Sequence, residues 1–344
     1  MKTQFTRRQW LQFGAASTGG VSFAALTGCE KREIPPPAGS PAAAARSRSH
    51  ANERYVWLSA HANLPLFTRH DHPALRLAAE ELGVQAVVTG PDALDISALV
   101  AALEQTTAQK PAGLMVVGWD RSALVPPINA AIERGIPVIC VDADVPASKR
   151  LCFVGTDWSE IGARQAEAMG RALQGRRGKV ALLGLVDQEI DQRAFEGFRS
   201  VAAKLGLECL EAQHDKGNTS EATHVAAAII QGTPELVGMA GFDSESGPGM
   251  GQAVKEARKL GQIVCTCVDA EEAHLRLLGE GALTACIGQK RELFTYLGLR
   301  TLFDLNHSPL RLTKDDARAG IHPVPSMINT GTYTVTRENL EAFL

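Results

Sequence analysis

The sequence lacks an excess of basic residues. Its 35 Lys and Arg residues are outnumbered by 38 Asp and Glu residues, which gives a formal net charge of −3. Proteins that bind nucleic acid neutralise its phosphates with clustered Lys and Arg side chains, and the body of this chain has no long basic run. We therefore predict no nucleic-acid partner.

A long, strongly apolar run is also missing, even near the N-terminus. The stretch that follows Arg7 and Arg8 is uncharged as far as Gly28, but Gly, Ala, Ser and Thr dilute its large apolar side chains. It falls short of the roughly 20 mainly apolar residues that a membrane span needs. A buried N-terminal helix is the alternative, and the small residues disfavour it.

Two short motifs indicate export instead. The segment "TRRQWL" resembles a twin-arginine export signal, and "LTGC" resembles a lipoprotein box. We predict that residues 1–28 are a cleaved signal peptide and that Cys29 is lipidated. Residues 29–53 are rich in Pro, Ala, Ser and charge, so they are predicted to form a disordered tether to a membrane.

Motifs for cofactors and metals are scarce. The chain has neither a Walker pattern nor GxGxxG, and the histidines and aspartate of 70–72, with His61 upstream, have no remote partner at metal-ligand spacing. Six cysteines follow Cys29, mostly inside apolar runs, where they are expected to be buried thiols. We predict no cofactor and no metal, while disulfide formation stays open.

The remaining chain alternates short apolar runs with helical segments. Runs such as "YVWLSA", "GLMVVG", "IPVICVD", "KVALLGLV" and "QIVCTCVD" are typical of buried parallel strands, and the segments between them have a 3.6-residue period. Glycines that follow helical segments, such as Gly83 and Gly135, are expected to end helices in a left-handed conformation. The pattern predicts an α/β fold.

The same series of strands and helices occurs twice, and about 290 residues is close to the size at which a chain divides into two domains. We predict two doubly wound parallel-sheet domains joined by three hinge crossings. The N-terminal lobe is predicted to comprise 54–156 and 290–318, and the C-terminal lobe 157–289 and 319–344. The crossings are expected near Thr156 and Asp157, near Gln289, and at 318–326.

Ligands of such folds bind at the carboxyl ends of the strands, in the crevice between the domains. After the first strand, Asn63 is a hydrogen-bonding amide and Phe67 an apolar wall for a sugar ring, or else a cap on the core. Trp119 is a stacking platform or the cover of a strand end. Asp142 and Asp144 share one face if their strand continues; they are hydroxyl acceptors, helix caps or the acid and base of a glycosidase.

The second half of the chain has a corresponding set. Gln192 and Arg193 open a helix, where Arg193 is a donor to hydroxyls or part of a surface salt bridge. Asp243 and Asp269 end strands, and Gln289 is another bidentate amide. A glycine-rich helix entrance around Pro248 suggests a close backbone approach to a neutral ligand.

From about residue 54 onward the chain resembles the type I periplasmic binding proteins of sugar ABC transporters, the branch that includes ribose-binding proteins. The matching segments are "ANLPLF", "IPVICVDAD", "VGTDWSEIG", "EGFRSVAAKLG", "GFDSES", "VDA" and "ACIGQ". The resemblance implies two lobes that close on a solute. The residues that it implies as sugar ligands are Asn63, Phe67, Asp142, Arg193, Asp243, Asp269 and Gln289.

These observations predict a receptor, not an enzyme. We expect a monomer in the periplasm or cell envelope that binds a small sugar or polyol of the ribose, xylose or inositol class, delivers it to ABC permease subunits, and reaches the membrane through a lipid anchor. Alternatives are an autoinducer-2 binding protein, a sensory receptor for a chemotaxis or kinase system and, less favoured, a glycosidase. A transcription regulator of this fold would begin with a helix-turn-helix, not an export leader.

Overall fold

A computed structural model describes residues 50–307, 311–316 and 318–344. The predicted signal peptide, Cys29 and most of the predicted tether lie outside the described residues. In the described part of the chain, no helix combines the length and the apolar character needed to cross a membrane.

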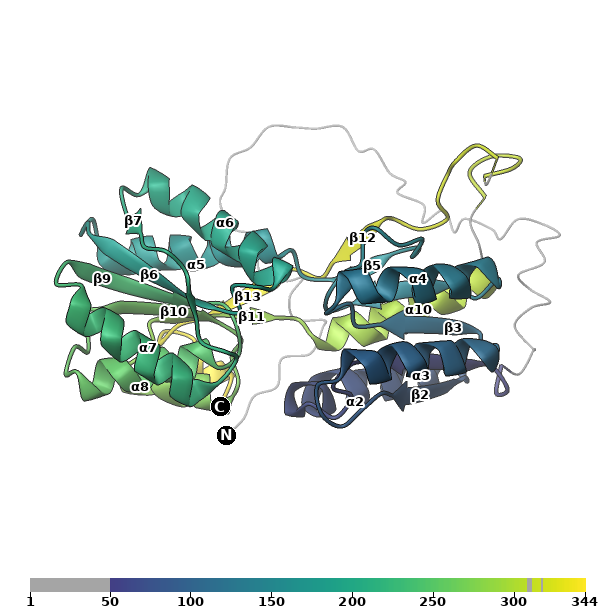
Figure 1. Cartoon of the computed structure of the whole chain (residues 1–344), viewed down its shortest axis with the longest axis horizontal. Helices are drawn as coiled ribbons and strands as arrows, with labels where there is room; N and C mark the ends of the chain where they lie inside the picture. The colour runs from purple at the N-terminus through teal and green to yellow at the C-terminus, as the bar shows by residue number, and fades with distance from the viewer. Residues whose placement is uncertain (1–49, 308–310, 317) are drawn as a thin grey trace, which may run out of the picture. The chain divides into compact units, whose positions relative to one another are not determined.

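The N-lobe is built on a six-stranded parallel sheet in the order β12-β5-β4-β3-β1-β2. Figure 1 labels β12, β5, β3 and β2 of this sheet. Its strands are β1 (Arg54–Leu58), β2 (Gln85–Thr89), β3 (Gly113–Val116), β4 (Val138–Val141), β5 (Phe153–Gly155) and β12 (Met327–Asn329). Its helices are the π-helical turn η2 (Phe67–Asp71), α2 (His72–Leu82), α3 (Ile96–Ala108), α4 (Arg121–Glu133) and α10 (Glu292–His307).

Both faces of this sheet are buried, which explains the continuous apolar runs. In β1, Tyr55 and Trp57 pack with residues of α2 and α10, whereas Val56 and Leu58 pack with residues of α3 and α4. Successive side chains of a strand point to opposite faces, so a strand that is covered twice must be apolar at every position.

The C-lobe repeats this design with a seven-stranded sheet. Its main path runs β13-β11-β10-β9-β6-β7, and β13 is antiparallel to β11. The strands are β6 (Lys179–Gly184), β7 (Glu208–Cys209), β8 (Gln213–His214), β9 (Leu236–Gly241), β10 (Val264–Val268), β11 (Ala285–Gln289) and β13 (Thr332–Val335). The helices are α5 (Trp158–Leu173), α6 (Glu189–Lys204), α7 (Thr219–Gly232), α8 (Ser246–Glu256), α9 (Glu272–Glu280) and the 3₁₀ turn η3 (Leu340–Ala342).

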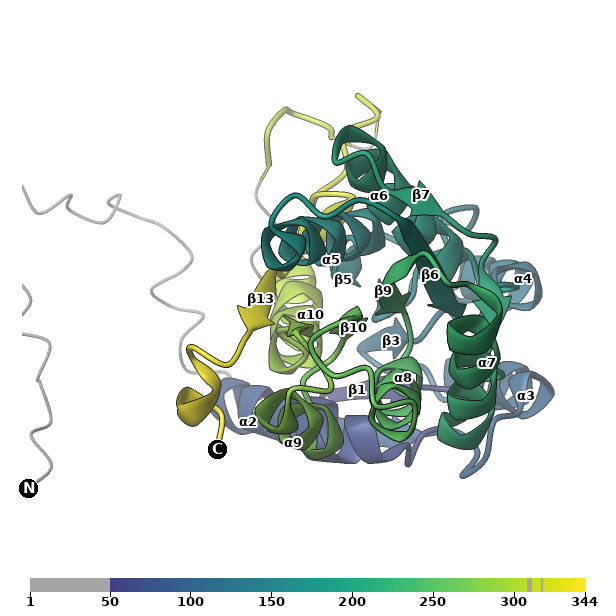
Figure 2. The ribbon, with the colours of Figure 1, turned by 90° about the vertical axis from the view of Figure 1, so that its left-hand side faces the viewer.

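Helices cover both faces of the C-lobe sheet. Figure 2 shows α5 and α6 over one face and α7, α8 and α9 over the other, in agreement with two separate apolar clusters. Helices α5 and α6 approach each other closely at glycines. A Cβ atom at Gly197 would lie 2.1 Å from the backbone oxygen of Ser159, so only glycine fits there.

The α/β fold with two parallel sheets is confirmed, and Gly83 and Gly135 have the expected positive φ. The chain passes between the sheets three times: between β5 and α5, between β11 and α10, and between β12 and β13. The third passage lies at Thr330 and Gly331, later than 318–326, because "SMINTGTYTV" forms two short strands in different sheets. Residues 319–326 therefore precede an N-lobe strand.

The predicted tether ends earlier than residue 53. Residues 50–53 form a turn in which the backbone N–H of Glu53 donates to the carbonyl of His50 (2.8 Å). The Gln85 N–H in turn donates to the carbonyl of Glu53 at 2.8 Å. These four residues are therefore attached to the N-lobe.

Candidate ligand-binding site

A cavity of about 490 Å³ lies at the carboxyl ends of strands from both sheets. Its N-lobe lining includes Trp119, after β3, and Asp142, after β4. Its C-lobe lining includes Asp243, after β9, and Asp269, after β10, and Gln289 at the end of β11 completes the set. These five were predicted from the sequence as site residues, and their position matches the strand-end rule for this class of fold.

Asp142 and Asp269 occupy equivalent positions in the two lobes. Each follows a buried strand, and each has φ of +66°. The backbone N–H of Asp142 donates to Val154 of the next strand (3.2 Å), and that of Asp269 donates to Ile287 of its next strand (3.0 Å). Left-handed backbone is unfavourable for a residue with a Cβ and is concentrated at functional sites. Both carboxylates are thus held at the cavity by the same strained turn.

Arg291 is the cation of the site. It is 4% exposed and contacts Asp71, at the end of η2, through Nε (3.1 Å) and Nη2 (3.4 Å). Its Nη1 donates to Asp142 at 2.8 Å. Burial lowers the pKa of Arg291, but the charges of Asp142 and Asp71 outweigh burial and raise it overall. Burial raises the pKa of Asp71 to about 6, although Arg291 opposes that shift.

The C-lobe side of the cavity carries several carboxylates. The pKa of Asp243 is raised to about 7. Burial is the main cause, and a hydrogen bond with Asp215 and the charge of Asp215 add to it. Burial also raises the pKa of Asp191 well above its usual range, and the charge of Asp243 adds to this effect. These groups therefore carry protons more readily than ordinary aspartates, and the cavity presents both donors and acceptors of hydrogen bonds.

Three buried polar atoms of the cavity lining have no hydrogen-bond partner among the described residues. They are Oδ2 of Asp243, Oε1 of Gln289 and the indole Nε1 of Trp158. Buried polar groups in proteins are nearly always paired. These atoms are two acceptors and one donor, and all three belong to residues that line the cavity.

Three predicted N-lobe residues do not line the cavity. Asn63 is exposed and donates from Nδ2 to Asp92. Phe67 is fully buried behind Trp119, with stacked ring centroids 5.6 Å apart, because η2 turns it into the core. Asp144 forms a two-point ion pair with Arg150 (2.6 and 2.7 Å). Its strand ends at Val141, so the condition under which Asp142 and Asp144 were expected to point the same way is not met.

Three predicted C-lobe residues also lie outside the lining. Helix α6 begins at Glu189 and turns Asp191 inward, which leaves Gln192 and Arg193 exposed. Arg193 pairs with Asp157 at 3.4 Å, the surface alternative that the sequence left open. Pro248 lines a neighbouring cavity of about 610 Å³ between η2, α8 and α9.

Sequence reasoning missed Arg291, Trp158 and Asp191 as residues of the cavity. Arg291 looks like an ordinary surface arginine after a strand, and its partners lie 149 and 220 residues away in the chain. One unused signal was present, since the tetrapeptide CVDA occurs at both 140–143 and 267–270. That repetition marks Asp142 and Asp269 as equivalent.

Ion pairs also join the lobes outside the cavity. Arg69 and His70 of η2 contact Glu271 before α9, with His70 Nε2 at 2.8 Å, and His70 Nδ1 lies 2.8 Å from Glu292. Hydrogen bonding to Glu271 and Glu292 outweighs burial and raises the pKa of His70 to about 9. A protonated His70 therefore links the N-lobe to the C-lobe.

The sequence profile of a family described as a periplasmic binding protein domain matches residues 56–307. The chain belongs to the periplasmic binding protein domain family. Membership of this family confirms the prediction that the protein binds a solute and is not an enzyme.

Relatives and solved structures of this family cover most of the chain. A D-ribose/D-allose-binding protein of Pseudomonas aeruginosa is 24% identical over 221 residues, which is 62% of this chain and 69% of the relative. The arabinose-binding protein AraP of Geobacillus stearothermophilus is 30% identical, with a TM-score of 0.75 over 85% of this chain and 99% of that one. A sugar-binding protein of a sugar ABC transporter from Bacillus halodurans is 27% identical, with a TM-score of 0.79 over 85% of this chain and 100% of that one.

Proposed function

We propose that this periplasmic binding protein is the extracytoplasmic receptor of an ABC importer and binds a small sugar or polyol between its lobes. The observation that carries the proposal is the convergence of Asp142, Asp243, Asp269 and Gln289 on one cavity. Carboxylate and amide oxygens accept hydrogen bonds from hydroxyl groups, and charge-assisted bonds are the stronger kind.

The volume of the cavity and its aromatic lining support a small-molecule ligand such as a sugar. The cavity volume of about 490 Å³ lies within the range of about 300–1,000 Å³ typical of small-molecule sites. The indoles of Trp119 and Trp158 provide flat apolar surfaces for the C–H faces of a sugar ring. Two relatives are named for ribose, allose or arabinose, so pentoses and hexoses are the first ligands to test.

Binding and lobe closure are coupled in this proposal. The ligand contacts Asp142 from the N-lobe and Asp269 from the C-lobe, so it gains its full set of hydrogen bonds only when the lobes are together. A ligand that binds one arrangement better shifts the population toward it. The closed arrangement would then be the one that the permease recognises.

Export and anchoring follow from the leader. The twin-arginine motif and Cys29 lie outside the described residues, so lipidation is proposed from the sequence alone. Mass spectrometry of the mature protein tests it, because a diacylated N-terminal Cys29 is expected and an uncleaved or unmodified N-terminus would contradict it.

The functional test is a thermal-shift screen of the purified chain against pentoses, hexoses, inositols and autoinducer-2. A ligand at 100 times its dissociation constant stabilises the folded state by about 2.7 kcal/mol. We expect a pentose or hexose to raise the unfolding temperature. If autoinducer-2 alone raises the unfolding temperature, the ligand is autoinducer-2 and not a sugar. If none of the compounds raises it, the proposal is contradicted.

A pair of variants then locates the site by calorimetric titration. Asp269→Asn removes a charged acceptor in the cavity, and a hydrogen bond to a charged group contributes about 1.5–3 kcal/mol, so affinity should fall about 10- to 150-fold. The matched control is Asp144→Asn, which removes a carboxylate bound to Arg150 outside the cavity. Its affinity should equal that of the parent, and an equal loss in both variants would refute this site.

A further inference from the structure

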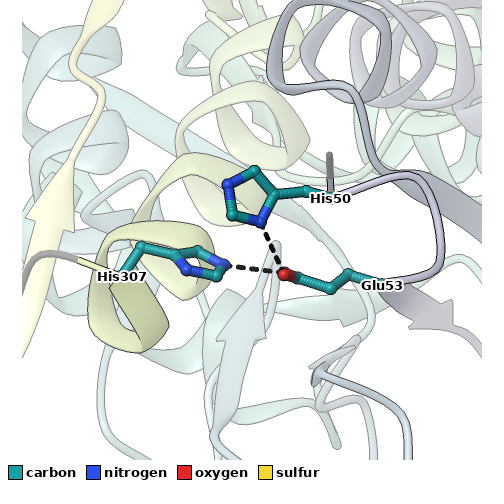
Figure 3. Close-up of side chains that lie close together, drawn as sticks. All are labelled: His50, Glu53 and His307. Carbon is teal, nitrogen blue, oxygen red and sulfur yellow. Dashed lines mark hydrogen bonds and ion pairs between the residues drawn. The ribbon is translucent and has the colours of Figure 1, made fainter. Parts of the chain in front are cut away.

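A cluster of metal-binding side chains lies where the described chain begins. His50, Glu53 and His307 offer one ligand atom each, and these atoms all lie within 4.8 Å of one another. Among the described residues, no other group of three or more His, Cys, Asp or Glu side chains has its ligand atoms this close together. Figure 3 shows both imidazoles directed at the same carboxylate. None of the three residues lines the sugar cavity.

We propose that His50, Glu53 and His307 form a binding site for a divalent transition-metal ion of the zinc class. His50 Nδ1 lies 2.7 Å from Glu53 Oε1, and His307 Nε2 lies 2.7 Å from Glu53 Oε2. Two imidazole nitrogens and one carboxylate oxygen are a set that zinc takes, usually with a water as fourth ligand.

Small shifts suffice to form the coordination shell. Zinc–ligand bonds of about 2.0–2.2 Å in a tetrahedron place ligand atoms about 3.3 Å apart. The donor atoms here lie at or below 4.8 Å from one another, so rotation of the side chains brings them to that spacing. The ion takes the place of the protons that the imidazoles share with the carboxylate, and those protons are released to solvent.

The surrounding residues hold the ligands in place. The hydroxyl of the fully buried Tyr55 donates to Glu53 Oε2 (3.1 Å), and Asn306 Nδ2 donates to that hydroxyl (3.1 Å). Such supporting hydrogen bonds orient metal ligands and tune their affinity.

The two imidazoles are also packed side by side. The ring of His50 lies edge-on to Phe303, with centroids 5.0 Å apart, and the ring of His307 lies 4.3 Å from the same phenyl ring. The side chains of the three ligands are 20%, 27% and 26% exposed, so an ion and a completing water reach the site from solvent.

A metal here would join distant parts of the chain. Glu53 and His307 are 254 residues apart in sequence, and the site connects the turn before β1 to the last residue of α10. The bound ion would thus fix the entry of the chain into the N-lobe, independently of sugar binding.

The experiment is a calorimetric titration of the purified, chelator-treated full chain with zinc chloride at pH 7.5. We expect one zinc ion per chain, and at least a tenfold loss of affinity in His50→Ala and in His307→Ala. Tyr55→Phe keeps the ligands but removes a supporting bond, and such losses weaken metal binding about 10- to 100-fold. Circular dichroism confirms that each variant is folded.

Two matched controls separate this site from other histidines. His224→Ala changes an exposed histidine on α7, and His70→Ala changes the histidine between Glu271 and Glu292; both should bind zinc as the parent does. Absence of zinc binding in the parent chain would overturn the proposal. Unchanged affinity in both His50→Ala and His307→Ala, or a loss confined to His70→Ala, would overturn it as well.

Discussion

Replacing Arg291 by Met should destabilise the protein more than any other single change of an arginine in the ion pairs described above. Arg291 is the cation between two buried carboxylates, since Asp71 is fully buried and Asp142 is 7% exposed. Its guanidinium also lies over the rings of Phe67 (5.2 Å) and Phe294 (5.1 Å). Met fills much of the same apolar volume but leaves both carboxylates without a counter-charge.

The expected loss follows from the cost of a buried unpaired charge. Removing one partner of a buried ion pair costs about 3–5 kcal/mol. The pKa of Asp71 in the folded protein is about 6, against an ordinary value of 3.8, so its contribution to stability is present below pH 3.8 and is lost as the pH rises through about 6. Arg291 lowers the pKa of Asp71, so its removal raises that pKa further. The stability of the variant then continues to fall up to a higher pH. The loss in Arg291→Met should therefore be larger at pH 8 than at pH 5.

Guanidinium unfolding at both pH values measures the effect, with Arg300→Met as the matched control. Arg300 is on the same helix and pairs with Glu81, but its side chain is 37% exposed, so its loss should cost at most about 1 kcal/mol. Adding Asp71→Asn to Arg291→Met should restore part of the stability at pH 8. A loss below about 1 kcal/mol, or an equal loss at both pH values, would refute this account of Arg291.

Two further outcomes are expected. His70→Ala should lower the free energy of unfolding by about 1 kcal/mol at pH 6. The pKa of the His70 imidazole is raised to about 9, so its contribution to stability is complete below pH 6.5 and disappears as the pH rises through 9. A deficit that persists at pH 10 in chemical denaturation would contradict the ion-pair role. Gly197→Ala should cost about 1–3 kcal/mol, because its methyl group meets the backbone of α5, whereas Gly232→Ala, with nothing within 4 Å, should be neutral or stabilising in thermal unfolding. Equal effects of the two glycine substitutions would show that helix packing is not the cause.

Sequence predicted the sheets well because their signal is local. A strand that is covered on both faces needs an apolar residue at nearly every position, and runs such as "VWL" and "VICV" meet that need. The same reasoning placed Asp142 and Asp269 correctly at strand ends. It failed at "SMINTGTYTV", where one continuous β pattern contains a passage between two sheets at Thr330 and Gly331. The pairing partners decide that division, because β12 pairs with β5 and β13 pairs with β11. Both partners lie more than 40 residues away in the chain, so no local pattern identifies them.

Whether a predicted site residue lines the cavity depends on what sets the direction of its side chain. Gln289 is the last residue of β11 and Asp269 is the first residue after β10, so the sheet itself aims them, and they line the cavity. Asp144 lies three residues beyond the end of β4, where direction depends on the backbone angles of the loop, and it pairs with Arg150. Arg291 was beyond reach for a different reason, since a buried arginine is identified only by the carboxylates that surround it. Those carboxylates come from η2 and from the turn after β4, so the central cation of the site is a product of the tertiary fold and not of any local pattern.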